Sequence, residues 1–141
     1  MAKKGFTIIE LLIVISVMAI LIAIVVPRFR GIQEEGNVSR AKGDVRTLLI
    51  AVESYRMHEK SLPGSLSALI ASTTKPNMIG SSLPKDPFKS GSDYGYAMSS
   101  GKGYYVIWSA GPSGSDAASV ADSGNVTLSS TDTIYASDGK I

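Results

Sequence analysis

An apolar run from Phe6 to Val26 is the feature that most constrains this chain, because its 21 residues hold one charged side chain, Glu10. A helix of that length rises about 30 Å, which matches the hydrocarbon core of a bilayer. An ordinary signal peptide has a shorter apolar core followed by a small-residue cleavage site, whereas this run continues directly into Pro27. The run therefore predicts a membrane-spanning helix that ordinary signal cleavage does not remove.

Length and composition narrow the classes of protein that the chain can belong to. Its 141 residues suit one small domain, and the absence of cysteine excludes disulfides and thiolate metal sites. Fourteen Lys and Arg face 12 Asp and Glu, and without Lys3 and Lys4 the balance is 12 against 12. A chain with no net charge has no global attraction for nucleic acid, so no nucleic-acid partner is expected.

Glu10 is out of place inside an apolar segment. A carboxylate in the hydrocarbon core costs about 3 kcal/mol even on lenient insertion scales, so something must compensate for it. One alternative is that Glu10 lies close enough to the helix start to reach the membrane interface. The other is a charged partner within an assembly.

The residues around Glu10 carry a family resemblance. The segment Lys4-Gly5-Phe6-Thr7-Ile8-Ile9-Glu10, followed by Leu11–Ile15, resembles the signature of type IV prepilins. This resemblance implies cleavage between Gly5 and Phe6 by a prepilin peptidase, and N-methylation of Phe6. Residues 1–5 would then be a leader and residues 6–26 the transmembrane and assembly helix. Pro27, which ends the apolar run, lies where the family places a proline.

Cleavage after Gly5 would place a new α-amino group at Phe6, four residues from Glu10. In an assembly, Glu10 of one subunit could neutralise the Phe6 amine of its neighbour. The carboxylate would then select the offset between subunits.

Residues 27–60 predict an amphipathic helix that continues into the head. Apolar residues recur there at spacings of three and four, namely Val38, Ala41, Val45, Leu48, Leu49, Val52 and Tyr55. Pro27 and the glycines after it weaken the stretch 27–36, so we expect a bend or local melting there. The alternative is a continuous curved helix.

Residues 61–141 predict a small β-sheet head. Ser65 is expected to cap a short helix that ends near Ala71. The aromatic runs Tyr94–Met98 and Tyr104–Trp108 predict a hairpin, and a third strand is expected at Val126–Leu128 or Thr133–Tyr135. The expected class is α+β, with a long N-terminal helix packed on an antiparallel sheet, as in the type IV pilin-like fold.

The head also carries a resemblance. Leu83–Phe88, Tyr94-Gly95-Tyr96 and Ser109–Pro112 are similar to the head of the major pseudopilin of type II secretion systems. In that family the loop after the last hairpin strand often binds calcium, which implies Ser113, Asp116 and Asp122 as ligands here. Ser113 replaces the family's usual aspartate, and an ordinary polar loop is the alternative.

The resemblance implies a structural subunit and no enzyme. Copies would be held in the inner membrane with their heads in the periplasm, surrounded by lipid until they assemble into a homopolymer. The implied partners are minor pseudopilins or minor pilins, the prepilin peptidase, an inner-membrane platform protein and its assembly ATPase. A secretion pseudopilus is the preferred function. The alternatives are a surface pilus for adhesion, motility or DNA uptake, and a single-pass anchored binding module.

Overall fold

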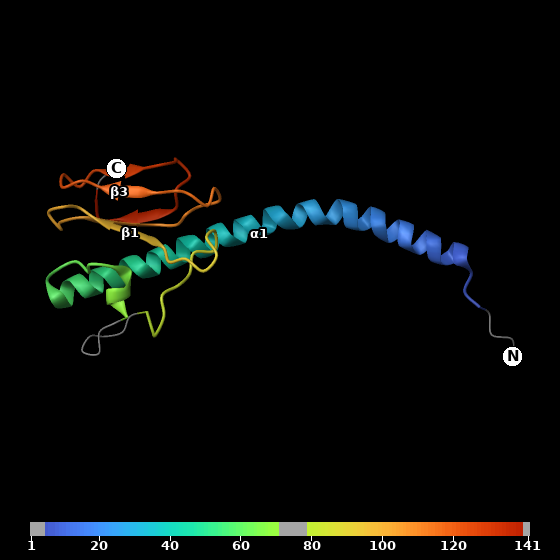
Figure 1. The fold of residues 1–141 in the computed structure, drawn as a ribbon, viewed down its shortest axis with the longest axis horizontal. Coiled ribbons are helices and arrows are strands. Elements are labelled where there is room, and N and C mark those ends of the chain that lie inside the picture. Colours follow the sequence, from blue (N-terminus) through green and yellow to red (C-terminus); the bar gives the residue numbers. More distant parts are fainter. Residues whose placement is uncertain (1–4, 71–78, 140–141) are drawn as a thin grey trace. The chain divides into compact units, whose positions relative to one another are not determined.

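The computed structural model describes residues 5–70 and 79–139, and Figure 1 traces its helices and strands. One long helix followed by short antiparallel strands confirms the expected α+β class. By their internal contacts the residues form two units, Met1–Gly36 and Asn37–Ile141, while the expected boundaries at residues 5, 26 and 60 stay predictions. The elements are α1 (Ile8–Glu59), the 3-10 helix η1 (Leu66–Leu69), β1 (Gly95–Met98), β2 (Tyr105–Trp108), β3 (Ala118–Val120), β4 (Val126–Leu128) and β5 (Tyr135–Ser137).

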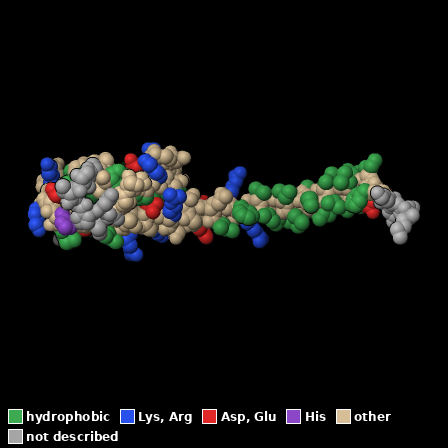
Figure 2. All heavy atoms as spheres, turned by 90° about the horizontal axis from the view of Figure 1, so that it is seen from below, with side chains coloured by type: hydrophobic (Ala, Val, Ile, Leu, Met, Phe, Trp, Pro, Cys, Tyr) green, Lys and Arg blue, Asp and Glu red, His purple; other side chains and the backbone are tan. Residues whose placement is uncertain are grey.

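The first unit consists, in its described part, of the start of α1 and the residues before it. Its apolar side chains are exposed all around the helix, as the green spheres of Figure 2 show on one face. Among the described residues, α1 alone is long and apolar enough to cross a membrane, and none of its most apolar window is buried by the chain itself. The described residues therefore offer no cover for this surface.

Pro27 lies inside α1, which runs without interruption through residues 27–36. The expected local melting is therefore not observed in the isolated chain, and the alternative, a continuous helix, is the arrangement found. Proline removes a single backbone donor, and the hydrogen bonds of the flanking turns remain. The helix ends at Glu59 as expected, where Lys60 takes a left-handed φ of 55°.

The second unit has its core between α1 and a three-stranded sheet. Residues of one α1 face, spaced by three and four, are buried there, as the amphipathic pattern predicted. Tyr94, Tyr105, Ile107 and Ile134 complete the core from the sheet side. The buried α1 residues of this cluster are Ala41, Val45, Leu48, Ala51 and Val52.

Strand β2 lies at the centre of the sheet, between β1 and β5, and pairs antiparallel with both. Its side chains alternate between the two faces, because successive residues of a strand point in opposite directions. Tyr105 and Ile107 enter the core with α1, whereas Val106 enters a second cluster with Ala118 and Val120. That second cluster is covered by the β3–β4 hairpin, which lies on the side of the sheet away from α1 (Figure 1).

The expected hairpin is confirmed, since β1 and β2 pair through Gly95↔Trp108 to Met98↔Tyr105. Both segments considered for a third strand contain strand residues, although β4 joins β3 in a separate sheet and β5 begins only at Tyr135. The cap expected from Ser65 is wrong, because its side chain makes no capping hydrogen bond to η1. A four-residue 3-10 turn leaves few free N–H groups to cap, and Ala71 lies outside the described residues.

Gly95 gives a test of the packing between β1 and β2. A Cβ atom at this position would collide with the indole ring of Trp108, its cross-strand neighbour. We expect Gly95→Ala to lower the free energy of unfolding by about 1 to 3 kcal/mol, as overpacking does. Urea unfolding in detergent, followed by the fluorescence of the chain's single tryptophan, measures it. Gly64→Ala, where the added atom meets nothing within 4 Å, is the matched control, and equal stability of the two variants would contradict the packing.

Candidate functional site

The start of α1 is organised by a reciprocal pair of hydrogen bonds between Thr7 and Glu10. Oε2 of Glu10 accepts from the Thr7 backbone N–H at 2.9 Å and from the Thr7 hydroxyl at 2.8 Å. In return, the Glu10 N–H donates to Oγ1 of Thr7 at 3.3 Å. This is a capping box, which satisfies two backbone donors that a helix start leaves unpaired.

The capping box gives Glu10 a local role that neither expected explanation included. The spacing Thr7-x-x-Glu10 carries the signal in the sequence, although the family signature gives Thr7 no role of its own. A carboxylate that accepts two hydrogen bonds from its own helix start is also less costly to bring near lipid. The pairing of Glu10 with an amine of a neighbour stays a prediction.

Gly5 and Phe6 precede the first turn of α1, outside any helix or strand, and both are exposed to solvent. The Phe6 side chain is 79% exposed. The peptide bond between these residues is therefore not protected by helical hydrogen bonds. Such geometry suits cleavage at this bond, and the role of both residues in processing stays a prediction.

In the head, tyrosine hydroxyls connect the sheet to carboxylates on α1. Tyr94 donates to Oδ2 of Asp44 at 2.9 Å, and Tyr105 donates to Oε1 of Glu53 at 2.8 Å. Burial, together with the hydrogen bond to Glu53, raises the pKa of Tyr105 well above its ordinary value of 10.0. Burial and the Asp44 bond raise the pKa of Tyr94 in the same way, so both hydroxyls remain donors at neutral pH.

The C-terminal end of the described chain is bound to α1 and β2 through Asp138. Asp138, which follows β5, receives the guanidinium of Arg56 at 2.8 Å through one oxygen. Its other oxygen accepts the backbone N–H of Tyr105 at 2.8 Å. One carboxylate thus joins α1, β2 and the last described residues.

Asp86 organises the loop that leads from β2 to β3. It is 2% exposed, and its carboxylate accepts from the Ser109 hydroxyl at 2.9 and 3.0 Å and from the Ala110 N–H at 2.6 Å. The Phe88 N–H is a further donor at 3.0 Å. A buried carboxylate is tolerated when its oxygens are hydrogen-bonded in this way. The sequence showed Asp86 only as part of a family-like segment, because its donors Ser109 and Ala110 lie more than 20 residues away.

Two of the three expected calcium ligands lie together in that loop. The Ser113 hydroxyl donates to Oδ1 of Asp116 at 2.8 Å, and Gly111 and Gly114 take positive φ values that let the loop turn tightly around them. Asp122 lies elsewhere in the fold, at the turn between β3 and β4. Its Oδ1 accepts the Gly101 N–H from the β1–β2 turn at 2.5 Å.

These donors only partly fit a calcium ion. Calcium takes six to eight oxygen ligands, often from several carboxylates. The loop itself supplies the Asp116 carboxylate, while Asp122 lies at a different turn, where one of its oxygens already accepts the Gly101 N–H. No three His, Cys, Asp or Glu side chains converge on a possible metal position among the described residues. Calcium binding stays a prediction.

Chelation tests the calcium prediction. If Asp116 and Asp122 hold calcium, removing it takes away a ligand that binds only the folded head, and the melting temperature of the head should fall. The measurement is thermal unfolding with added calcium and with excess chelator, on the wild-type chain and on Asp116→Ala and Asp122→Ala. The melting temperatures of the two variants should not change with chelator. An unchanged wild-type melting temperature would contradict calcium binding.

The role of Asp86 is testable by urea unfolding followed by tryptophan fluorescence. Asp86→Ala leaves the Ser109 hydroxyl and two backbone N–H groups without their acceptor, and each such loss costs about 1 to 3 kcal/mol. We expect a loss of about 3 kcal/mol or more in the free energy of unfolding. Asp93→Ala is the control, because its ion pair with Lys85 is exposed and worth about 1 kcal/mol at most. Equal losses would contradict the proposed anchoring.

Comparison with known proteins assigns both parts of the chain. A family model described as type II secretion system (T2SS), protein G, matches residues 28–126, and one described as the prokaryotic N-terminal methylation motif matches residues 1–26. No solved structure shows a significant match to this chain.

Curated relatives agree with these matches. The type II secretion system core protein G of Pseudomonas aeruginosa is 32% identical over 136 residues, covering 87% of this chain and 94% of the relative. The protein of the same name from Escherichia coli K12 is 29% identical, over 79% of this chain and 83% of the relative. A fimbrial protein of P. aeruginosa is 39% identical over 64 residues, which cover 45% of this chain. The prepilin signature, the α+β head and these matches agree, and the chain belongs to the type II secretion system protein G family, that of the major pseudopilin.

Proposed function

We propose that this chain is the main structural subunit of a type II secretion pseudopilus, a filament that helps to drive folded proteins across the outer membrane. The observation that carries this is the joint presence of a family-matched head and an apolar α1 surface that no described part of the chain covers. An apolar surface of that size is stable in water only if something covers it. Lipid covers it before assembly, and the helices of other copies cover it afterwards.

Localisation follows from the same surface. The subunit is anchored in the inner membrane by residues 6–26, with the head in the periplasm. Assembly moves the anchor from lipid into the filament, so that the finished filament is periplasmic. Extraction from the bilayer requires work, which we assign to an assembly ATPase acting through an inner-membrane platform protein.

Processing prepares the helix start for assembly. A prepilin peptidase cuts between Gly5 and Phe6, where the backbone is exposed and not yet helical. The new Phe6 amine then lies beside Thr7 and Glu10, which already cap the helix. The Glu10 carboxylate already accepts hydrogen bonds from Thr7 at this end of the membrane helix. It can take the amine of a neighbouring subunit as a further partner.

Cohesion and register come from different groups. Apolar helices that pack laterally provide cohesion of roughly 25 cal/mol per Å² of surface removed from water, without defining an axial position. The Glu10–Phe6 pair defines the position, because a misplaced carboxylate is left unpaired in an apolar filament core. No catalysed reaction is proposed. Minor pseudopilins of the same construction would begin or cap the polymer.

A type IV pilus subunit is the second candidate. The match to a fimbrial protein favours it, but that match spans 64 residues, less than half of this chain. The family model for protein G instead covers most of the head. Loss of protein secretion on deletion of the gene supports a pseudopilus, and loss of long surface fibres supports a pilus. A single-pass anchored binding module predicts neither defect.

Processing is the first test. Chain recovered from membranes of a host with prepilin peptidase should begin at methylated Phe6, which intact mass and N-terminal analysis determine. Gly5→Ala should be processed in part, while Gly5→Trp should block cleavage because the bulky side chain adjoins the bond that is cut. A wild-type chain that starts at Met1 in such a host would overturn the proposed assembly route.

The register role of Glu10 is separable from its capping role. Glu10→Val removes both, whereas Thr7→Ala removes only the capping hydroxyl and keeps the carboxylate. We expect Glu10→Val to insert normally into membranes but to lower filament yield by about tenfold or more, equivalent to roughly 1.4 kcal/mol per contact. Thr7→Ala should keep most of the wild-type yield. Wild-type yield from Glu10→Val would exclude the register, and equal defects in both variants would assign the effect to the helix cap.

A further inference from the structure

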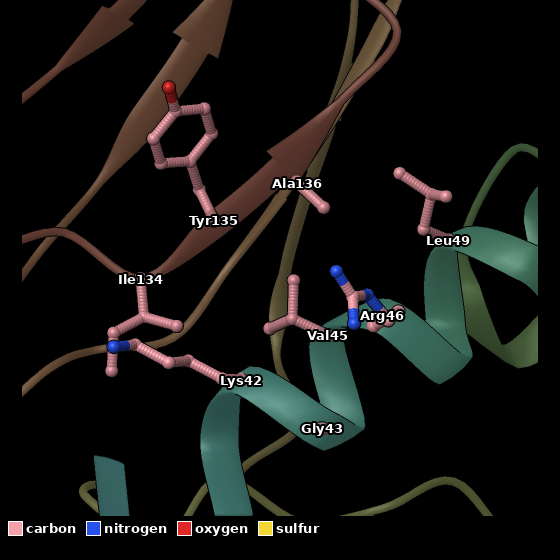
Figure 3. A pocket seen from close by; sticks show the side chains of 8 residues that line it. All are labelled: Lys42, Gly43, Val45, Arg46, Leu49, Ile134, Tyr135 and Ala136. Carbon is pink, nitrogen blue, oxygen red and sulfur yellow. The ribbon is translucent and has the colours of Figure 1, made fainter. Parts of the chain in front are cut away.

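A groove runs along the second unit between α1 and the segment that contains β5. One part of it, with a volume of about 430 Å³, is shown in Figure 3. Val45, Leu49 and Ala136 give it an apolar floor, and Lys42 and Arg46 leave α1 on the side that faces the groove. Gly43 contributes no side chain, and a Cβ atom there would meet nothing within 4 Å, so the helix surface stays open at this point.

A second hollow extends the first. It has a volume of about 490 Å³ and shares Lys42, Ile134 and Tyr135 with its neighbour. It continues past Pro112 to Asp132, which adds one carboxylate at the far end. We call the two hollows together the α1–β5 groove. Its cationic part therefore lies at Lys42 and Arg46, over the apolar floor.

These two cations differ from two other basic residues of α1, Arg40 and Arg56. Arg40 pairs with Asp44 at 3.6 Å, and Arg56 pairs with Asp138 at 2.8 Å. Lys42 and Arg46 make no ion pair or hydrogen bond with any described residue. They lie one turn apart, exposed, and flank the same floor. The groove thus has a free double positive charge.

The complementary feature lies in the first unit. Glu34 and Glu35 are adjacent and exposed, and neither has a partner among the described residues. Ile32, which is 65% exposed, lies one turn before Glu35 and on the same side of the helix. Going round the helix, Glu35 adjoins Ile32 and Glu34 lies beyond Glu35, so this short surface presents an apolar side chain beside one carboxylate, with a second carboxylate further round.

We propose that the Glu34–Glu35 pair of one subunit docks into the α1–β5 groove of a neighbouring subunit, with Lys42 and Arg46 as its ionic partners and Ile32 on the apolar floor. This contact rests on the proposed filament. It would fix the axial alignment of neighbouring subunits a second time, in addition to the Glu10–Phe6 pair. Opposite charges on facing surfaces favour the matched alignment and penalise misaligned ones.

The Glu10–Phe6 pair and the proposed groove contact require neighbouring subunits to be displaced in the same axial direction. Pairing Phe6 of one subunit with Glu10 of the next displaces parallel helices by four residues, or about 6 Å. Pairing Glu35 with Lys42 displaces the same two subunits in the same direction by seven residues, or about 10 Å. The difference of about 4 Å is within the reach of glutamate and lysine side chains. Both pairs can therefore act between the same neighbours.

A charge-swap experiment tests the contact. Lys42→Glu with Arg46→Glu should lower filament yield by about tenfold or more, because four carboxylates then face each other. Glu34→Lys with Glu35→Lys should have the same effect, and all four changes together should restore yield to within about twofold. The control is the melting temperature of the head, which should not move because Lys42 and Arg46 are exposed and unpaired.

Crosslinking gives a second readout, because the chain has no cysteine of its own. Chains carrying Glu35→Cys and chains carrying Lys42→Cys, assembled together, should form disulfide-linked dimers in filaments. Chains with Glu35→Cys and Thr47→Cys should not, since Thr47 is exposed on α1 but does not line the groove.

The outcomes separate this contact from the filament itself. Normal filaments from the groove variant, or no crosslink between positions 35 and 42 in intact filaments, would overturn the contact and leave the proposed function standing. A defect confined to the groove variant, without rescue by the fourfold swap, would also overturn it and assign the groove to a different anionic partner. Absence of filaments from the wild-type chain would overturn both.

Discussion

The exposed apolar surface of residues 6–26 is the constraint from which the rest of this protein follows. Its side chains are uncovered on every side, and no other described segment of the chain packs against them. Lipid and the same helix in another copy are both apolar, so exchanging one for the other changes the free energy less than exposing the surface to water would. A subunit with such an anchor can move from membrane to filament without passing through water.

That exchange leaves axial alignment undefined, because apolar surfaces slide with little change in energy. Charged groups provide alignment, since an unpaired charge in an apolar environment is costly. Glu10 is the group available in the membrane segment, and the capping box holds its carboxylate at the helix start in the isolated chain. The α1–β5 groove would add alignment outside the membrane, where lysine and arginine keep their charge at little cost.

The head has to hold its shape without disulfides, and it does so with carboxylates that each join distant segments. Asp86 binds the loop after β2, Asp138 binds α1 and β2 together, and Glu53 receives the Tyr105 hydroxyl. Hydrogen bonds to charged groups contribute about 1.5 to 3 kcal/mol each, more than neutral ones do. A small core of aliphatic and tyrosine side chains between α1 and the sheet supplies the rest. The groove lies beside this core, so its walls are set by rigid elements.

Local patterns in the sequence were enough to predict the apolar helix, its amphipathic continuation, the β1–β2 hairpin and the α+β class. Each depends on residues close together in the chain, where spacing alone decides which face is buried. The family signature around Gly5, Phe6 and Glu10 is likewise local, and its Thr7-x-x-Glu10 cap was readable there. Tertiary structure alone decided the partners of Asp86 and Asp138, the separation of Asp122 from Asp116, the second sheet of β3 and β4, and the groove beside Lys42. These features join residues that are distant in sequence, and their contacts exist only once the core has placed the strands.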